Sequence, residues 1–208
     1  MLYSEIKRET LGHLNQYSIA GAPVAASYNN QADYLNRIPI LINEGIMNIR
    51  TLVKPEPVVY PLRGGEDYGD MIRYELPSDF WGLRTGGVTV IRDGKFRRTT
   101  QYMLQGKKTI LVPKAAQGSY TVEYYKYPAQ LPTNQSLHDD YDLPEDREVI
   151  QTATYYAAAQ LALMDDEFVY ASLYNDYESR LGRIGGRVTA EVQTTQDVYG
   201  FHEAGWLG

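Results

Sequence analysis

Apolar side chains recur at helical spacing in the first quarter of the chain. The spacing predicts a short helix over about residues 2–17, which the glycine and proline at 21–23 end. A second, stronger stripe of leucine, isoleucine and valine occupies residues 35–53. Pro39 lies inside this stripe, so we expect either a bend there or a helix whose regular part starts at about that residue.

The pattern changes to strand-like runs separated by turn residues after residue 55. The clearest is a hairpin of residues 88–92 and 95–97, joined by Asp93-Gly94, because this dipeptide supplies the positive φ angles of a tight turn. Further strands are expected at about residues 71–76, 99–104, 109–112 and 119–127. Together these runs predict an antiparallel β-meander inserted between helices.

Helical spacing returns near residue 143. The segment Leu143-Pro144-Glu145-Asp146 is typical of a helix start, because proline fits the first helical position and acidic residues favour the first turn. This helix is predicted to run to about Met164. Asp165 or Asp166 can cap a following helix, which Gly182 is expected to end.

These elements predict an α+β fold with three parts. Residues 1–54 and 139–183 form a core of about four helices, and residues 55–138 form the inserted antiparallel β domain. Residues 184–208 form an extended C-terminal arm. The arm ends in an aromatic and apolar cluster, which we identify as a candidate partner interface: Tyr199, Phe201, Trp206 and Leu207.

The composition is that of an ordinary globular protein with a mildly acidic balance. The 208 residues include 20 Lys and Arg against 26 Asp and Glu, a formal charge of -6, which gives no reason to expect generic nucleic-acid affinity. The absence of cysteine removes disulfides, thiolate metal sites and a cysteine nucleophile. No apolar run is long enough to predict a membrane span, and the start of the chain does not resemble an export signal.

Charge is distributed unevenly along the chain. Residues 84–126 hold nine basic and two acidic residues, whereas residues 139–180 hold two basic and eleven acidic ones. The two regions either face each other or water within one subunit, or join neighbouring subunits in a head-to-tail ring. The candidate intersubunit contacts are Arg92, Lys95, Arg97 and Arg98 on one side and Asp165, Asp166 and Glu167 on the other.

No constellation of residues points to catalysis, a metal or a cofactor. His13, His138 and His202 lie far apart and in no zinc-binding spacing, and the acidic run 139–142 lacks the pattern of a calcium loop. Residues 105–109 do not complete a phosphate-binding loop, because Gln101 stands where its first glycine belongs. We therefore expect no cofactor, no metal and no enzymatic activity.

Four short segments, in this order, resemble the head-to-tail connector or adaptor proteins of tailed bacteriophages. They are Leu41-Ile42-Asn43-Glu44-Gly45, then Leu76-Pro77-Ser78-Asp79-Phe80, then Tyr124-Tyr125-Lys126-Tyr127-Pro128, and last Leu143-Pro144-Glu145 followed by Tyr155-Tyr156-Ala157-Ala158. Together with the helices that contain them they span residues 35 to about 181. The β insertion departs from the smallest, all-helical members of this family.

The resemblance implies a structural virion protein in the phage neck, made in the host cytoplasm. Such proteins assemble as a ring, commonly a dodecamer, beneath the portal, extend the DNA channel and provide the attachment site for the tail. The implied partners are the portal protein, neighbouring copies, tail or nozzle proteins, and double-stranded DNA that passes without sequence-specific binding, with no membrane. The resemblance also assigns portal or neighbour docking to the C-terminal arm.

Three other functions stay open at this stage. A tail gatekeeper or tail-completion protein would share the ring but occupy another level of the virion. A carbohydrate-binding β module would use the 19 tyrosines as sugar-stacking faces. A lysozyme-like enzyme would need one selected pair among the many carboxylates.

Overall fold

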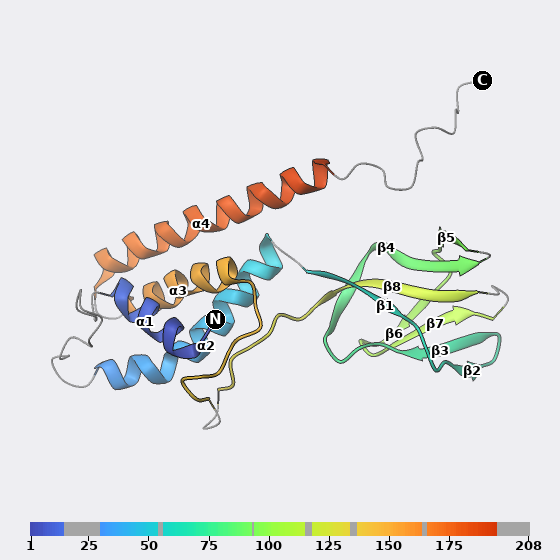
Figure 1. Ribbon diagram of the computed structural model, residues 1–208, viewed down its shortest axis with the longest axis horizontal. Helices are drawn as coiled ribbons and strands as arrows, with labels where there is room; N and C mark the ends of the chain where they lie inside the picture. The colour runs from blue at the N-terminus through green and yellow to red at the C-terminus, as the bar shows by residue number, and fades with distance from the viewer. Residues whose placement is uncertain are drawn as a thin grey trace, which may run out of the picture. The chain divides into compact units, whose positions relative to one another are not determined.

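The computed structural model describes residues 1–14, 30–53, 56–92, 94–114, 118–133, 137–163 and 166–194. The chain divides into two compact units (Figure 1): a helical unit of Met1–Lys54 and Ala129–Gly208, and a β unit of Pro55–Pro128. The α+β class and the antiparallel β insertion are therefore confirmed. The second boundary lies ahead of the expected residue 138, because Leu131 is already buried in the helical core.

The described part of the helical unit contains four helices, of which α3 is central. They are α1 (Tyr3–His13), α2 (Asn30–Leu52), α3 (Arg147–Ala162) and α4 (Glu167–Thr194). α3 packs against each of the other three, and its alanines are buried on several sides. Small side chains let neighbouring helix backbones approach closely, so the alanine run at 157–159 explains the central position of α3.

Two helix boundaries differ from the expectation because core packing outweighs a local breaker. α2 begins at Asn30 and runs through Pro39, so a helix starting at about Pro39 is wrong. Ile38 and Ile42 on either side are fully buried, which offsets the hydrogen bond that proline cannot donate. α4 likewise continues through the exposed Gly182 to Thr194 and brings Ile184 into the core. The extended arm therefore does not start at residue 184.

α3 begins at Arg147, later than Pro144 suggested. The carboxylate of Asp146 accepts a hydrogen bond from the backbone N–H of Glu148 at 3.0 Å and caps the helix. Residues 141–143 are instead extended against the start of the chain, where Leu2 forms a β-bridge with Asp142. A backbone engaged in this pairing cannot also be the first turn of a helix.

The β unit consists of two four-stranded antiparallel sheets. The first has the strand order β1-β8-β4-β5 and the second β2-β3-β7-β6. Their bounds are β1 Pro57–Pro61, β2 Glu66–Tyr68, β3 Met71–Glu75, β4 Phe80–Arg92, β5 Lys95–Arg98, β6 Met103–Gln105, β7 Thr109–Pro113 and β8 Ser119–Lys126. Val88, Val122 and Ile110 from both sheets share one buried core. The expected meander is corrected to this order, in which β8 lies between β1 and β4.

The β hairpin read from the sequence is confirmed, with Ile91 opposite Phe96 and Gly94 at a φ of 72°. The expected strand 99–104 shortens to β6, because residues 99–102 carry the chain from one sheet to the other. Strands β1 and β2 and the first half of β4 were not predicted. Proline at both ends of β1 hides that strand, which is tolerated because β1 lies at a sheet edge.

Candidate interface surfaces

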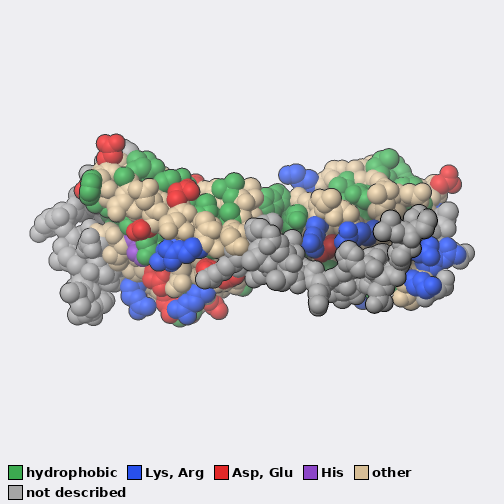
Figure 2. All heavy atoms as spheres, turned by 90° about the horizontal axis from the view of Figure 1, so that it is seen from above, with side chains coloured by type: hydrophobic (Ala, Val, Ile, Leu, Met, Phe, Trp, Pro, Cys, Tyr) green, Lys and Arg blue, Asp and Glu red, His purple; other side chains and the backbone are tan. Residues whose placement is uncertain are grey.

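The predicted basic residues come together along one side of the β unit. Lys95, Arg97 and Arg98 are exposed on the edge strand β5, and Arg92 lies opposite Lys95 at the end of β4. Lys107 and Lys108 lie in the turn after β6, which is an edge strand of the other sheet. Figure 2 shows Lys and Arg side chains gathered over the β unit on the face that it draws.

Five cations of this side contrast with Lys114 and Lys126, which have acidic partners elsewhere in the β unit. Lys114 pairs with Asp67 at 3.1 Å, and Lys126 pairs with Glu56 at 3.0 Å. Among the described residues, no ion pair involves Lys95, Arg97, Arg98, Lys107 or Lys108. Apolar side chains are exposed on the same two edge strands: Phe96 on β5 is 61% exposed, and Met103 and Leu104 on β6 are 59% and 40% exposed. We call these eight residues, from Lys95 to Lys108, the basic edge.

Two of the three predicted acidic residues, Asp166 and Glu167, lie at the start of α4, in the helical unit. Asp166 caps α4, accepting hydrogen bonds from the backbone N–H groups of Phe168 and Val169 at 2.9 and 3.1 Å. Glu167 is exposed, and Phe168 beside it is 85% exposed. Asp165 and the arm residues Tyr199, Phe201, Trp206 and Leu207 lie outside the described residues.

Phe168 was not singled out from the sequence, although a signal was present. It falls outside the apolar stripe of α4, in which Leu173, Tyr177 and Leu181 are buried. A large apolar residue on the polar side of an amphipathic helix is a sign of an interaction surface. The same argument applies to Phe96 on β5, where all four residues are exposed.

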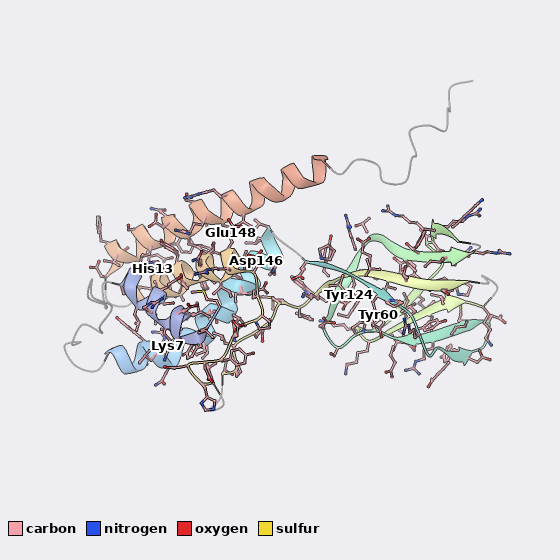
Figure 3. The ribbon with its side chains drawn as sticks, viewed as in Figure 1. Lys7, His13, Tyr60, Tyr124, Asp146 and Glu148 are labelled. Carbon is pink, nitrogen blue, oxygen red and sulfur yellow. The ribbon has the colours of Figure 1, made fainter. Side chains whose placement is uncertain are left out.

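Two of the four family-like segments meet in the β unit and hold its strands together. The phenol of Tyr124 donates a hydrogen bond to Asp79 at 2.8 Å, and the backbone N–H of Tyr127 donates to the carbonyl of Asp79 at 2.8 Å. Burial of Tyr124, helped by this bond, raises its pKa to about 12. Tyr60 of the neighbouring strand β1 lies nearby (Figure 3). These tyrosines serve packing.

The other two segments join α2 to α3 and to the chain that returns from the β unit. A Cβ atom on Gly45 would lie 3.1 Å from the Cβ of Ala153, so glycine allows α2 and α3 to approach closely. Near the end of α2, Arg50 forms an ion pair with Glu145, and their side chains are only 6% and 3% exposed. The matching segments therefore hold the fold.

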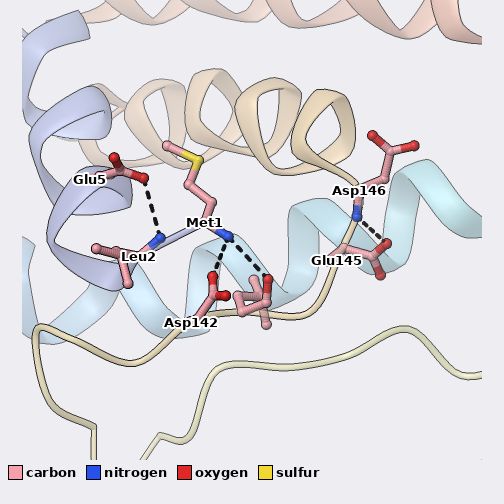
Figure 4. Close-up of polar contacts among 7 residues, drawn as sticks. Met1, Leu2, Glu5, Asp142, Glu145 and Asp146 are labelled. Carbon is pink, nitrogen blue, oxygen red and sulfur yellow. Dashed lines mark hydrogen bonds and ion pairs between the residues drawn. The ribbon is translucent and has the colours of Figure 1, made fainter.

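The start of the chain is held by the segment that precedes α3 (Figure 4). The amino group of Met1 donates to the carboxylate of Asp142 at 2.6 Å and to the carbonyl of Leu143 at 3.3 Å. The backbone N–H of Asp146 donates to Glu145 at 2.8 Å. Each acidic group here accepts a hydrogen bond from a backbone or terminal N–H donor. The cluster of acidic residues therefore stabilises the fold and needs no ligand to account for it.

His13 belongs to a packed cluster in which three helices meet. Its ring stacks on Tyr155 at 3.8 Å between centroids, and its Nε2 lies 3.1 Å from the hydroxyl of Thr154. The guanidinium of Arg180 lies 4.2 Å from the centre of the Tyr155 ring and donates to the phenol at 3.0 Å. Burial, and then the charge of Arg180, lower the pKa of His13 to about 4. His13 is therefore neutral near pH 7 and ties α1 to α3 and α4.

An open groove of about 400 Å³ lies between α2, α3 and the segment after the β unit. Ile40, Met47 and Tyr156 line it together with Glu44, whose charge adds to burial in raising the pKa of Tyr156. Within the described ranges no cluster of three metal-ligating side chains occurs, and no described helix is long and apolar enough to cross a membrane.

Comparison with known proteins agrees with the resemblance drawn from the four segments. The chain matches the family described as SU10 adaptor protein over residues 1–199, which includes both units. No curated protein matches the chain. The match covers far more than half of the sequence and extends to residues on both sides of the β insertion. The chain therefore belongs to the SU10 adaptor protein family and is a structural adaptor protein of a bacteriophage.

Proposed function

We propose that this chain assembles as a ring beneath the portal of a phage head, extends the DNA channel and provides the attachment site for the tail. The observation that carries this proposal is the family match over residues 1–199. Because the match spans both units, the β insertion belongs to the adaptor and is not an unrelated addition. The partners are the portal protein, further copies of the chain, most simply twelve, and tail or nozzle proteins.

The charge of the two units supports a division of roles in such a ring. The β unit holds eleven Lys and Arg against eight Asp and Glu, a formal charge of +3. Because the whole chain carries -6, the helical unit carries -9. An acidic wall repels the phosphates of DNA and avoids binding it. We therefore assign the helical unit to the channel wall, past which DNA moves without sequence-specific contact.

The C-terminal arm is the proposed anchor on the portal or on a neighbouring copy. Its cluster of Tyr199, Phe201, Trp206 and Leu207 places large apolar side chains on an otherwise polar stretch. Aromatic residues of this kind dominate the binding energy of many interfaces. The double variant Phe201→Ala/Trp206→Ala is expected to lose incorporation into particles, and unchanged incorporation would refute this role.

The test of the function is co-expression with the phage portal protein, followed by native mass spectrometry of the purified complex. The chain alone, at 23.6 kDa, is the control. A fixed multiple of this mass on each portal ring is the expected result. No complex with the portal, but a fixed complex with a tail-tube protein, would replace the portal adaptor by a gatekeeper or tail-completion protein.

A further inference from the structure

We propose that in the assembled ring the basic edge of one copy docks on the outer face of α4 of the next copy. This inference deepens the proposed ring assembly and rests on it. It names which two surfaces meet and which residues carry the contact. Both surfaces are described above as parts of separate units, and each is exposed.

The outer face of α4 is the acidic counterpart. Its exposed residues include three acidic ones, Glu167, Asp176 and Glu178. Phe168 is also exposed on this helix. No Lys or Arg occurs anywhere in residues 167–179. We call this set of four exposed residues the acidic face. It presents negative charge along α4, with one large exposed apolar side chain in the first turn of the helix.

The basic edge also combines charged and apolar side chains, with the opposite charge. Its five cations accompany the exposed Phe96, Met103 and Leu104, and none of them has an ion-pair partner among the described residues. Because side chains alternate along a strand, Phe96 and Arg98 point to one face of β5 and Lys95 and Arg97 to the other. A protein interface typically buries an apolar centre within a polar rim. The two surfaces match in this respect, since each combines exposed apolar side chains with charged ones and the two charges are of opposite sign.

Two simpler explanations of the basic edge account for less. Lys and Arg on an edge strand can prevent aggregation, but that role leaves the large exposed Phe96 and Met103 on the same edges unexplained. A phosphate-binding surface would explain the cations and, through stacking on a base, Phe96. It would not explain the exposed Met103 and Leu104.

The contact joins two different patches, so it is heterologous. Repetition of a heterologous contact with a fixed rotation closes a ring, whereas a contact of identical patches stops at a dimer. A basic patch and an acidic patch on each copy therefore suit the assembly proposed for this chain. Opposite charges at the contact also favour one orientation of the subunits over others.

Charge reversal tests the contact between the basic edge and the acidic face, because two variants that each fail alone are expected to assemble when mixed. Lys95→Glu/Arg97→Glu makes both surfaces acidic, and Glu167→Lys/Glu178→Lys makes both basic. Each variant alone is expected to form portal-bound rings at least about tenfold less well, because like charges then meet. An equal mixture of the two is expected to restore rings in which the variants alternate, as read by native mass spectrometry.

A matched control separates this contact from a general effect of charge. Arg8→Glu/Arg63→Glu changes exposed residues outside both surfaces and lowers the formal charge by the same amount as the basic-edge variant. The control is expected to assemble like the wild type. Full assembly of both charge-reversed variants on their own would overturn the inference, and portal binding by the wild type would leave the proposed function intact.

Disulfide trapping gives an independent readout because the chain has no cysteine of its own. Phe96→Cys and Phe168→Cys, on separate chains, are expected to form a mixed disulfide in the assembled complex. Leu52→Cys, at another exposed apolar position, is the control partner for Phe96→Cys. A disulfide formed only within one chain of the double variant would overturn the inference.

The remaining outcomes separate the two proposals. If the wild type fails to bind the portal but the mixed disulfide still forms at high protein concentration, the portal function fails and the contact stands. If the basic-edge variant keeps its rings and instead loses binding to double-stranded DNA of random sequence, the basic edge is a phosphate-binding surface and the contact is refuted.

Discussion

The side-chain amide of Asn43, in α2, forms two hydrogen bonds with the backbone of Leu131. The amide N–H donates to the carbonyl of Leu131 at 2.9 Å, and the amide oxygen accepts from its N–H at 2.7 Å. A side chain thus satisfies both backbone groups of a buried residue in a segment that is neither helix nor strand. This pairing fastens the chain to the helical unit directly after the β unit.

Asn43→Asp is expected to lower the free energy of unfolding by about 1–3 kcal/mol. Aspartate keeps the acceptor but loses the donor, so the carbonyl of Leu131 loses its partner and faces a second oxygen. Chemical denaturation measures the change. Asn36→Ala, at an exposed position of the same helix, is the control and is expected to have little effect. Equal stability of Asn43→Asp and the wild type would contradict the role of the pair.

The buried Arg50–Glu145 pair predicts a large effect of removing one partner. Glu145→Ala is expected to cost about 3–5 kcal/mol, because the buried guanidinium of Arg50 then loses the carboxylate of Glu145. Asp67→Ala removes one partner of the exposed Lys114 pair and is expected to cost about 0–1 kcal/mol. Thermal or urea unfolding of both variants measures the contrast, and similar values for the two would refute it.

The double variant Arg50→Met/Glu145→Leu tests whether the pair acts as one unit. Removing both charges of the pair avoids burying one of them without the other, so the double variant is expected to lose less stability than the two single losses added together. Additive losses would show that the two side chains act independently.

Two glycines in helices predict changes of opposite sign. Gly45→Leu is expected to destabilise the helical unit by about 1–3 kcal/mol, because its side chain would overlap Ala153 and Tyr156. Gly182→Ala is expected to stabilise α4 by about 0.5–1 kcal/mol, because nothing lies within 4 Å of the new Cβ and alanine is the better helix former. Melting temperatures compare the two, and a stabilising Gly45→Leu would be decisive against close α2–α3 packing.

The lowered pKa of His13 predicts a loss of stability in mild acid. The folded chain takes up the His13 proton only near pH 4, whereas the unfolded chain takes it up near pH 6.5. The free energy of unfolding therefore falls as the pH is lowered from about 6.5 towards 4 and gains nothing from this group above 6.5. The charges that act on His13 are those of Arg180, which lowers its pKa, and Asp176, which raises it.

His13→Gln is expected to flatten this pH dependence, since glutamine keeps a polar contact to Thr154 without the titration. His138→Gln, at an exposed position, is expected to leave the slope as in the wild type. Denaturant titrations at pH 7 and pH 5 measure both. An unchanged slope in His13→Gln would show that other groups cause it.

Local signals in the sequence predicted the kinds of element well. The apolar stripes of α2, α3 and α4 and the Asp-Gly hairpin are set by neighbours within a few residues, which is why they could be read directly. The ends of α2 and α4 could not, because burial of Ile38 and Ile184 decides whether a helix continues past Pro39 or Gly182. Such burial depends on residues far away in the sequence.

Strand order and the surfaces depended on contacts between distant residues. Val122 of β8 lies opposite Val88 of β4 on one side and opposite Tyr60 of β1 on the other. No local pattern in the sequence predicts such partners. The uneven charge was visible in the sequence. It took the structure to show that Lys114 and Lys126 are neutralised by acidic neighbours while Lys95 and Arg97 are not.

The pairing of β1 with β8 has a consequence for how such a chain can change in evolution. Pro57 lies opposite Tyr125, and the backbone N–H of Lys126 donates to the carbonyl of Glu56 at 3.3 Å, so the β unit begins and ends at one place. Neighbouring strands are about 5 Å apart, a gap that a short turn can span. Because its two ends lie close together, the β unit can be inserted into the helical unit at the place where a short surface loop would fit. A phage lineage can gain, lose or exchange this module by recombination while the helices keep their packing.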